Sequence, residues 1–423
     1  MCGIVGYIGK KEAYPLLING LKRLEYRGYD SAGIAILNNK TINVHKKKGK
    51  VTDLENAISD KDKVMGSLGI GHTRWATHGE PNDNNAHPHA SENGKFVLIH
   101  NGIIENYSRL RKRLKDRGYK FKSETDTEVL ANLIEYIYLK GKVSAEIAVR
   151  LALTKVVGAY GIVVICKDEP DKLIAARKGS PLVIGIGKDE YFLASDATPI
   201  VEHTNSVIYL NDNDVAILKK KGELILKTIR NDKLKPKIQT LDLDIGEIDK
   251  NGYDHFMLKE IFEQPESILD TFRGRVAKDY SDIYLGGLYN VLPKLTEAKR
   301  IIIIACGTSW HAGLVGEYLI EKYARIPVEV EYGSEFRYRS PVIYKDDVVI
   351  AISQSGETAD TLAAISLAKE AGALVLGICN VVGSSIPRET SAGVYTHAGP
   401  EIGVASTKAF TAQVTVLTMM ALV

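Results

Sequence analysis

The sequence predicts a layered α+β domain followed by an α/β domain with a doubly wound parallel sheet, and three observations predict this division. Residues 1–230 contain many short apolar runs bounded by Gly, Asn, Asp or Pro, with few helical stretches. Residues 231–252 are polar, rich in Lys and Asp, and without helical period, which is typical of a linker. Residues 253–423 alternate near-continuous apolar strands with helices, the pattern of a parallel sheet covered on both faces.

In the first domain, apolar runs between turn residues predict strands at 2–9, 31–37, 67–76, 96–100, 158–166, 173–177, 181–187, 191–195, 206–210, 214–218 and 223–229. Helical periodicity interrupts them mainly at 16–24 and 127–139. Many strands with few long helices indicate packed sheets covered by helices. In the second domain the pattern predicts helices at 255–272 and from about 310 and 358, with strands at 300–307, near 328, at 347–353 and at 373–380.

The composition excludes several classes of protein. The chain has 423 residues, of which 45% are hydrophobic and 25% charged, so it can bury enough apolar surface to offset the entropy of folding. This excludes a disordered or collagen-like chain, and the length fits two or three domains of about 150 residues. The net charge of +3 is spread along the chain, and lysine runs at 46–48 and 219–221 lie beside glycines, as in hairpin tips. No nucleic-acid partner is expected.

The four cysteines are far apart and form no C-x-x-C motif, so we expect neither a metal site nor a disulfide framework. A reducing, cytoplasmic location fits this. No basic segment precedes an apolar one at the N-terminus, and no apolar run reaches the roughly 20 residues of a spanning helix, so no membrane partner is expected. Residues 414–423 are apolar and lack a stop signal, which predicts a helix that is incomplete at the end of the chain.

Cys2 directly follows the initiator methionine, and a small second residue permits removal of Met1. The residue would then carry both a thiol and an α-amino group, with reference pKa values of about 8.5 and about 7.7 to 8.0. A thiol becomes a competent nucleophile when a nearby base takes its proton, and this amine is such a base near neutral pH. The alternative is that Cys2 fills a position in the alternating strand 2–9.

Three further segments supply groups of complementary chemistry. Arg74, in GHTRWATHGEPNDNNAHPH, offers a planar fork of donors that suits a carboxylate. Asn101 and Gly102 follow the apolar strand 96–100, where a side-chain amide and an unobstructed backbone N–H can face one oxyanion. Asp126, just before a helix, can hold an ammonium group, and its alternative role is to cap that helix.

The motifs in these segments are CGIVG, KRLEYRGYDSAG, GHTRWATHGEP, HNGIIEN and SETDTE. Together they resemble the glutaminase domain of the N-terminal-nucleophile glutamine amidotransferases, and most closely the glutamine–fructose-6-phosphate aminotransferase family. The resemblance covers the whole chain in order, and it implies an αββα fold for the first domain.

This resemblance implies a role for each residue of the site. Cys2 attacks the side-chain amide of L-glutamine to form a thioester, and Asn101 and Gly102 hold the oxyanion. Arg74 and Asp126 bind the α-carboxylate and α-ammonium groups of glutamine. Four more residues are implied nearby: Thr77 and His78 lining the pocket, Trp75 gating a channel, and His87 ordering the site. From the residues alone, a core tryptophan and a structural histidine remain the alternatives for the last two.

Two strand–loop–helix junctions of the second domain, IIIIACGTSWHAG and VVIAISQSGETADT, place hydroxyl groups after buried strands. Free N–H groups at a helix start favour an anion at that edge of a sheet. With EIGVASTKAF they resemble the sugar isomerase (SIS) domain of the same family, and no G-x-G-x-x-G fingerprint is present. The residues implied to hold D-fructose 6-phosphate, chiefly its phosphate, are Thr308, Ser309, Ser353, Gln354, Ser355, Thr358 and Ser406.

The resemblance implies transfer of the glutamine amide nitrogen to D-fructose 6-phosphate, giving glucosamine 6-phosphate and glutamate without a cofactor, as the first step of hexosamine synthesis. Family members carry a second SIS domain and a C-terminal tail that supply the isomerisation groups. These are absent from the sequence, so we expect this chain to act as a glutaminase and the full-length family protein to be a homodimer.

Two alternatives remain open. An amidophosphoribosyltransferase-like glutaminase would need paired acidic residues in a phosphoribosyl diphosphate loop, and none is found. A non-enzymatic sugar-phosphate sensing module would suit residues 300–423 taken alone, but it leaves Cys2, Arg74, Asn101 and Asp126 unexplained.

Overall fold

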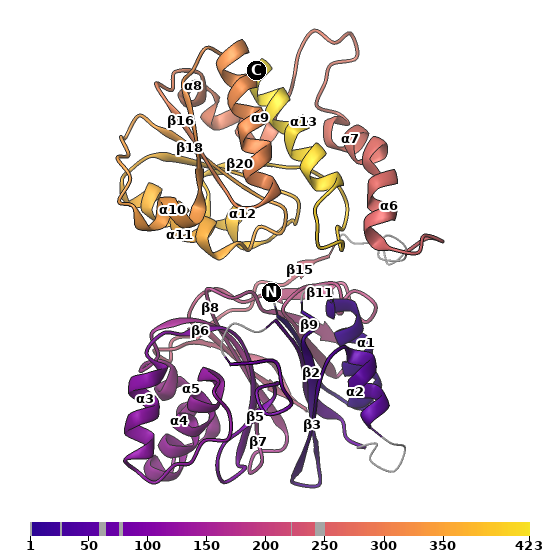
Figure 1. Ribbon diagram of the computed structural model, residues 1–423, viewed down its shortest axis with the longest axis vertical. Coiled ribbons are helices and arrows are strands. Elements are labelled where there is room, and N and C mark those ends of the chain that lie inside the picture. The colour runs from indigo at the N-terminus through magenta and orange to yellow at the C-terminus, as the bar shows by residue number, and fades with distance from the viewer. Residues whose placement is uncertain (1, 26–27, 59–64, 76–78, 221, 242–249) are drawn as a thin grey trace. The chain divides into compact units, whose positions relative to one another are not determined.

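The structure is a computed structural model that describes residues 2–25, 28–58, 65–75, 79–220, 222–241 and 250–423. It divides into two units, Met1–Ile245 and Gly246–Val423 (Figure 1). Each unit has its own sheets and its own buried core.

Two antiparallel sheets form the middle of the first unit. One sheet contains β1 (Gly3–Ile8), β2 (Ser31–Asn38), β3 (Thr41–Lys48), β4 (Leu68–Arg74), β9 (Val183–Gly187), β10 (Glu190–Ala194), β11 (Ser206–Tyr209) and β15 (Gln239–Thr240). The other contains β5 (His89–Ala90), β6 (Phe96–Ile104), β7 (Gly158–Cys166), β8 (Lys172–Lys178), β12 (Asp214–Lys219), β13 (Ile225–Thr228) and β14 (Lys233–Leu234). Their strand orders are β15-β11-β9-β10-β1-β4-β2-β3 and β14-β13-β12-β8-β7-β6-β5.

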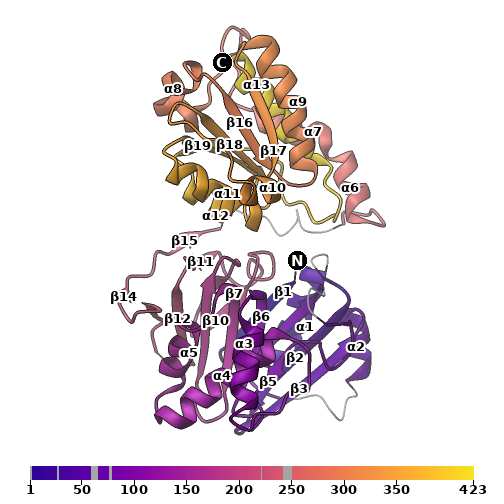
Figure 2. The same ribbon diagram turned by 60° about the vertical axis from the view of Figure 1, so that its left-hand side comes forward.

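Helices cover the outer face of each sheet, as Figures 1 and 2 show. The eight-stranded sheet carries α1 (Ala13–Leu24) and α2 (Val51–Ala57), and the seven-stranded sheet carries α3 (Tyr107–Lys115), α4 (Asp126–Gly141) and α5 (Ala145–Leu153). Side chains alternate along β6: Val97 and Ile99 join the core between the sheets, whereas Phe96 and Leu98 join the core under the helices. The four layers, helix–sheet–sheet–helix, confirm the predicted α+β domain.

The predicted linker, 231–252, is partly sheet. β14 pairs with β13, and β15 pairs with β11, so both strands extend the sheets of the first unit. The division between the units falls after Ile245. Two-residue edge strands are held by backbone pairing and bury little, so they carry no apolar alternation for the sequence to reveal.

A single parallel sheet forms the centre of the second unit. Its strands are β16 (Ile301–Ala305), β17 (Val328–Tyr332), β18 (Val348–Ser353), β19 (Leu374–Cys379) and β20 (Ala392–Tyr395), in the order β17-β16-β18-β19-β20. Its helices are α6 (Phe256–Phe262), α7 (Gln264–Phe272), α8 (Leu292–Thr296), α9 (Thr308–Tyr323), α10 (Gly333–Tyr338), α11 (Ala359–Glu370), α12 (Ser385–Glu389) and α13 (Lys408–Leu422), with a 3-10 helix at Gly286–Val291.

Both faces of this sheet are covered, which confirms the predicted doubly wound arrangement. In β16, Ile301 and Ile303 pack into the core with α9 and α13, whereas Ile302 and Ile304 pack into the core with α10 and α11. The chain passes from β16 to β17 on one side and then crosses to β18 on the other. The strand order therefore reverses between β16 and β18, and the carboxyl ends of these strands form the edge where open α/β sheets bind ligands.

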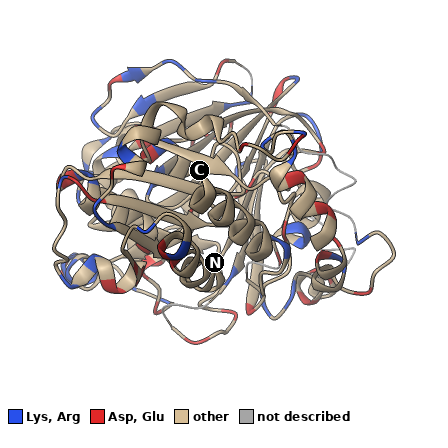
Figure 3. Ribbon diagram, turned by 90° about the horizontal axis from the view of Figure 1, so that it is seen from above, with Lys and Arg blue, Asp and Glu red and all other residues tan. Residues whose placement is uncertain are grey.

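Within the described residues, no helix is both long and apolar enough to cross a membrane. Figure 3 shows Lys and Arg interspersed with Asp and Glu along the chain, in keeping with a net charge close to zero.

Candidate active site

Cys2 immediately precedes β1, and its thiol contacts the residue that follows β4. The backbone N–H of Trp75 donates to Cys2 Sγ at 3.3 Å, and Sγ lies 3.5 Å from the Trp75 carbonyl oxygen. Burial of the sulfur raises the pKa of the Cys2 thiol above its usual value, while the Trp75 N–H and the charge of Arg74 act in the opposite direction. The thiol is therefore protonated at neutral pH and needs a base to react.

The indole of Trp75 is not part of the core. Its residue is 47% exposed, and its ring meets that of Tyr29 edge-on with the centroids 5.3 Å apart. The alternative of a core tryptophan is therefore wrong. The backbone of Trp75 contacts the Cys2 thiol, and its exposed ring is free to contact a small molecule.

Asn101 and Gly102 lie near the end of β6, and Asn101 contacts Cys2 directly. Asn101 Nδ2 donates to the backbone oxygen of Cys2 at 2.9 Å, and Asn101 Oδ1 lies 2.9 Å from His72 Nε2. Gly102 has a φ of +123°, and a Cβ at this position would lie 2.2 Å from the Ala159 carbonyl oxygen. The strand thus requires glycine at position 102, and β6 places the Asn101 side-chain amide against the backbone of Cys2.

Arg74 and Asp126 are both buried, with exposed fractions of 3% and 6%. Arg74 is the last residue of β4, directly before Trp75, and its Nη2 donates to the Gly79 carbonyl at 3.2 Å. Asp126 is the first residue of α4, and its Oδ2 accepts from the backbone N–H of Ile104 at 2.8 Å. Arg74 and Asp126 are thus a cationic and an anionic side chain, each held by a backbone hydrogen bond next to an element that carries a site residue.

The expectation that Asp126 alternatively caps α4 is wrong. Thr125 is the N-cap residue, and its hydroxyl accepts from the Glu128 N–H at 3.4 Å. Asp126 reaches instead to β6, which is the strand that carries Asn101. The predicted pocket residues Thr77 and His78 lie outside the described residues.

His87 belongs to a buried cluster of four histidines, His72, His87, His89 and His100. The rings of His72 and His87 stack with centroids 4.2 Å apart. The Thr127 hydroxyl, in the first turn of α4, lies 2.8 Å from His87 Nε2 and 3.0 Å from His100 Nδ1. Burial lowers the pKa of His72 to about 3 and the pKa of His87 well below its usual value, so both rings are neutral.

Through these contacts the cluster connects α4 to β4 and β6. It therefore fixes the positions of the elements that carry Arg74, Asn101 and Asp126. Within the described residues, no group of His, Cys, Asp and Glu is arranged to hold a metal ion. Of these four histidines, only His87 is predicted as a site residue from the sequence. The signal for His72 was its place two residues before Arg74, which puts both side chains on one face of β4.

In the second unit, three of the predicted sugar-phosphate residues, Thr308, Ser353 and Thr358, lie at the edge where the strand order reverses. Thr308 is the first residue of α9, and Ser353 is the last residue of β18. The Ser353 hydroxyl accepts from the Gly356 N–H at 3.0 Å and lies 3.0 Å from the Thr358 hydroxyl, the N-cap of α11. Two helix starts and a turn of backbone N–H groups are suited to bind an anion.

The other four predicted residues of this site have mixed surroundings. Ser355 accepts from the Glu357 N–H at 3.2 Å, and the Gln354 carbonyl accepts from the Asn380 N–H. Ser309 is buried and accepts from Gln413 Nε2 at 3.0 Å, so it also joins α9 to α13. Ser406 donates to Glu401 Oε2 at 2.8 Å, which fixes it within the loop before α13.

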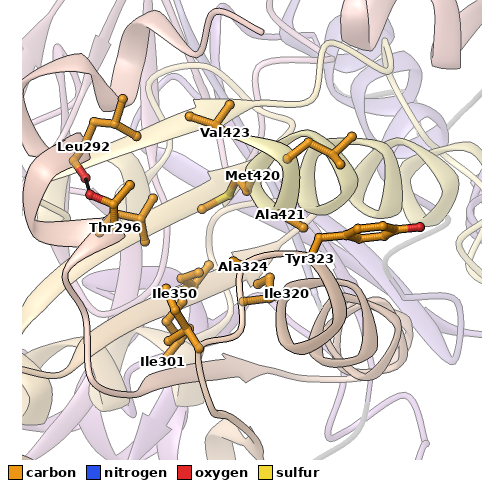
Figure 4. Close-up of a pocket in the computed structure, with 13 residues that line it drawn as sticks. Leu292, Thr296, Ile301, Ile320, Tyr323, Ala324, Ile350, Met420, Ala421 and Val423 are labelled. Carbon is orange, nitrogen blue, oxygen red and sulfur yellow. Dashed lines mark hydrogen bonds between the residues drawn. The ribbon is translucent and has the colours of Figure 1, made fainter. Parts of the chain in front are cut away.

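An apolar pocket of about 270 Å³ lies elsewhere in the second unit, between α8, α9 and α13 (Figure 4). Ile301, the first residue of β16, helps to line it, so it opens near the amino end of that strand and away from the ligand edge. Its hydroxyl groups are those of Thr296 and Tyr323, and Thr296 donates to the Leu292 carbonyl of its own helix. This lining carries no group suited to bind a phosphate.

Two family models match separate parts of this chain. Residues 72–202 match a family model described as a glutamine amidotransferase domain, and residues 294–423 match one described as an SIS domain. A solved structure described as the C-terminal domain of glucosamine-fructose-6-phosphate aminotransferase from Francisella tularensis is 45% identical over 41% of this chain and 48% of that chain, with a TM-score of 0.39.

Similarity over the whole of this chain is found to proteins named glutamine–fructose-6-phosphate aminotransferase (isomerizing). Those of Bacteroides thetaiotaomicron and Chlorobaculum tepidum are each 61% identical to this chain, over 423 and 425 residues. Each alignment covers 100% of this chain and 69% of the relative. The chain therefore belongs to the glutamine–fructose-6-phosphate aminotransferase (isomerizing) family.

Proposed function

We propose that this chain is a glutamine-dependent amidotransferase that releases ammonia from L-glutamine for the conversion of D-fructose 6-phosphate to glucosamine 6-phosphate. Family membership supports the overall reaction, L-glutamine plus D-fructose 6-phosphate giving glucosamine 6-phosphate and glutamate. The observation that carries the glutaminase half is the pair of contacts made by Cys2: its thiol accepts from the Trp75 N–H, and its backbone oxygen accepts from the Asn101 amide.

The chemistry starts with the Cys2 thiol giving its proton to a base. After removal of Met1, the α-amino group of Cys2 is that base, since its reference pKa of about 7.7 to 8.0 lies near neutral pH. The sulfur attacks the side-chain carbonyl carbon of glutamine, and the carbonyl oxygen becomes an oxyanion. The C–N bond then breaks, the leaving nitrogen takes the proton and departs as ammonia, and a thioester remains. Water hydrolyses the thioester to glutamate and the free thiol.

Asn101 Nδ2 and the Gly102 N–H are the proposed oxyanion donors. One hydrogen of the Asn101 amide binds the Cys2 carbonyl oxygen, which leaves the other for the oxyanion. Arg74 and Asp126 bind the α-carboxylate and α-ammonium groups of glutamine. Glutamate would bring a further negative charge to the thiol, so the same pocket disfavours the product.

The remaining proposed roles concern groups around the bound glutamine. Trp75 covers the thiol and gates the path of ammonia, in keeping with its exposed ring. His87 orders the site through Thr127 and His72. Thr77 and His78 are assigned to the glutamine pocket from their sequence motif alone.

In the second unit, the proposed ligands of fructose 6-phosphate are Thr308, Ser309, Ser353, Gln354, Ser355, Thr358 and Ser406. The place of Thr308, Ser353 and Thr358 where β16 and β18 lead into helices supports this assignment, because phosphates bind where helix starts present free N–H groups. We further propose that the full-length family protein is a homodimer. The four cysteines are free thiols, which fits a reducing, cytoplasmic location.

The test of the glutaminase is ammonia and glutamate release by the purified chain, with removal of Met1 checked by intact mass. The Cys2→Ala variant should lose the activity. Cys166→Ala is the matched control, because Cys166 is buried in the core and its burial raises its thiol pKa to about 11. If the processed wild-type chain releases no ammonia from glutamine, the proposed function is wrong.

A further inference from the structure

His72 and Asn101 form a hydrogen bond between the two sheets of the first unit. His72 lies in β4 of the eight-stranded sheet, and Asn101 lies in β6 of the seven-stranded sheet. His72 Nε2 is 2.9 Å from Asn101 Oδ1 and 3.2 Å from the backbone oxygen of His100. The His72 side chain is fully buried, so no solvent competes for either contact.

These two contacts fix which ring nitrogen of His72 carries the proton. The backbone oxygen of His100 can only accept a hydrogen bond, so Nε2 must be the protonated nitrogen. Within the described residues, Nδ1 of His72 has no hydrogen-bond partner. A buried N–H without an acceptor is unfavourable, so the surroundings of Nδ1 also favour its unprotonated form.

The proton on Nε2 in turn fixes the orientation of the Asn101 amide. A donor at Nε2 requires an acceptor opposite it, which is Asn101 Oδ1. The amide nitrogen then faces Cys2, where Nδ2 donates to the Cys2 carbonyl at 2.9 Å. In the reverse orientation, Nδ2 would face the Nε2–H and Oδ1 would face the Cys2 carbonyl, so both contacts would be repulsive.

We propose that His72 is a positioning residue for the glutaminase reaction: its Nε2–H holds the Asn101 amide with the nitrogen toward the thiol, so that an N–H meets the oxyanion. This inference rests on the proposed function. A flipped amide would place an oxygen against the developing negative charge, so the wrong orientation opposes the reaction as well as removing a donor.

The surroundings of His72 keep its ring neutral, with the single proton on Nε2. Its ring stacks on His87, and the charged or titratable groups that interact with it include Arg74, His87, His89 and His100. Positive charge nearby and the loss of water both disfavour a second proton, so the pKa of His72 lies near 3 and Nδ1 stays unprotonated at working pH. The orientation of the Asn101 amide therefore does not change near neutral pH.

The first experiment compares two substitutions in the full chain. His72→Leu fills the buried volume without a donor, whereas His72→Gln restores an N–H near the position of Nε2. We expect His72→Leu to lower kcat for glutamine hydrolysis about 10- to 100-fold with little change in KM, below the about 100- to 1,000-fold loss that follows removal of a whole oxyanion donor. His72→Gln should recover most of kcat.

A double-mutant cycle with Asn101→Ala distinguishes positioning from general structural support. If His72 acts through Asn101, His72→Leu should cost nothing further in kcat once the Asn101 amide is absent. His89→Leu is the matched control, because His89 is a buried member of the same cluster that contacts Thr125 at 3.1 Å. His89→Leu and Asn101→Ala should act independently, so the fold-changes that they cause in kcat should multiply in the double variant.

The results separate this inference from the proposed function. An inactive wild-type chain refutes the proposed function itself. An active wild type in which His72→Leu and Asn101→Ala have multiplicative effects on kcat overturns the positioning role alone. If His72→Leu does not fold, nitrogen NMR of the unmodified protein with labelled histidine decides the question: a protonated Nε2 supports the inference, and a protonated Nδ1 overturns it.

Discussion

The carboxylate of Asp126 accepts a hydrogen bond from the backbone N–H of Ile104 at 2.8 Å. Asp126 begins α4, and Ile104 is the last residue of β6, three positions after Asn101. Together with the contact between Thr127 and His100, this bond joins the helix that carries the proposed ammonium ligand to the strand that carries the proposed oxyanion donor. In the proposed site, the groups that bind the two ends of glutamine are therefore held at a fixed separation, which is how a rigid site selects a substrate by length.

Asp126→Asn should raise KM for glutamine about 10- to 100-fold, because a hydrogen bond to a charged group contributes about 1.5 to 3 kcal/mol. The fold should persist, since the asparagine oxygen can still accept from the Ile104 N–H. Steady-state kinetics of glutamate release give this value. Asp189→Asn is the control, because Asp189 is an exposed partner of Lys10 and should leave KM unchanged. An unchanged KM for Asp126→Asn would remove Asp126 from the glutamine site.

Gly102→Ala should abolish most glutaminase activity and destabilise the first unit. An added Cβ would lie 2.2 Å from the Ala159 carbonyl oxygen, and φ is +123°, so the backbone must shift and move the proposed oxyanion donor. Gly118→Ala is the control that introduces the backbone strain without the steric clash. Gly118 also has a positive φ, +93°, but there is open space around its Cβ position. Gly118→Ala should cost stability by about 1 kcal/mol and leave kcat unchanged. Equal activities of the two variants would argue against the role of Gly102.

The sequence was sufficient to predict the layers and the parts of the site that follow directly from strand ends. The apolar run 96–100 predicts a strand with two buried faces, which the structure confirms. The predicted end of that strand is wrong, because β6 continues to Ile104 and both Asn101 and Gly102 pair with β7. Ser353 and Thr358 are predicted by the strand–loop–helix pattern, and both lie at the reversal of strand order.

The contacts between sheets could not be predicted in this way. The bond between His72 and Asn101 depends on how β4 and β6 face each other across two sheets, and periodicity within one strand holds no such information. The contact of the Trp75 N–H with Cys2 depends equally on the pairing of β1 with β4. The N-cap of α4 is Thr125, one residue before Asp126, which the sequence offered as the alternative cap. Helix boundaries are assigned only to within one or two residues.

Acid should destabilise the first unit through its buried histidines. The pKa of His72 is lowered to about 3, and those of His87 and His89 are well below 6.5, so below about pH 6.5 the unfolded chain binds protons that the folded chain does not. The free energy of unfolding should therefore fall as pH decreases from about 6.5 toward 3, by up to about 1.4 kcal/mol per pH unit for each histidine.

His72→Gln isolates the contribution of one ring, because it removes one titrating group and keeps the donor. Its free energy of unfolding should fall less steeply with acid, by about 1.4 kcal/mol per pH unit less than wild type. Urea titrations followed by tryptophan fluorescence should be made in a Trp310→Phe background. Trp75 is then the remaining tryptophan, so the fluorescence reports unfolding of the first unit alone. Parallel curves for the two proteins would show that His72 takes up its proton in the folded state as well.

Fructose 6-phosphate should raise the melting temperature of the second unit, and the Ser353→Ala/Thr308→Ala double variant should weaken this shift. The Ser353 hydroxyl holds the turn through the Gly356 N–H and contacts Thr358, while Thr308 begins α9, so the double variant disturbs both helix starts. Ser366→Ala is the control, because its exposed hydroxyl only bonds the Leu362 carbonyl within α11. Scanning fluorimetry against sugar-phosphate concentration measures the effect. An identical shift in the double variant and the control would place the phosphate elsewhere than the edge between β16 and β18.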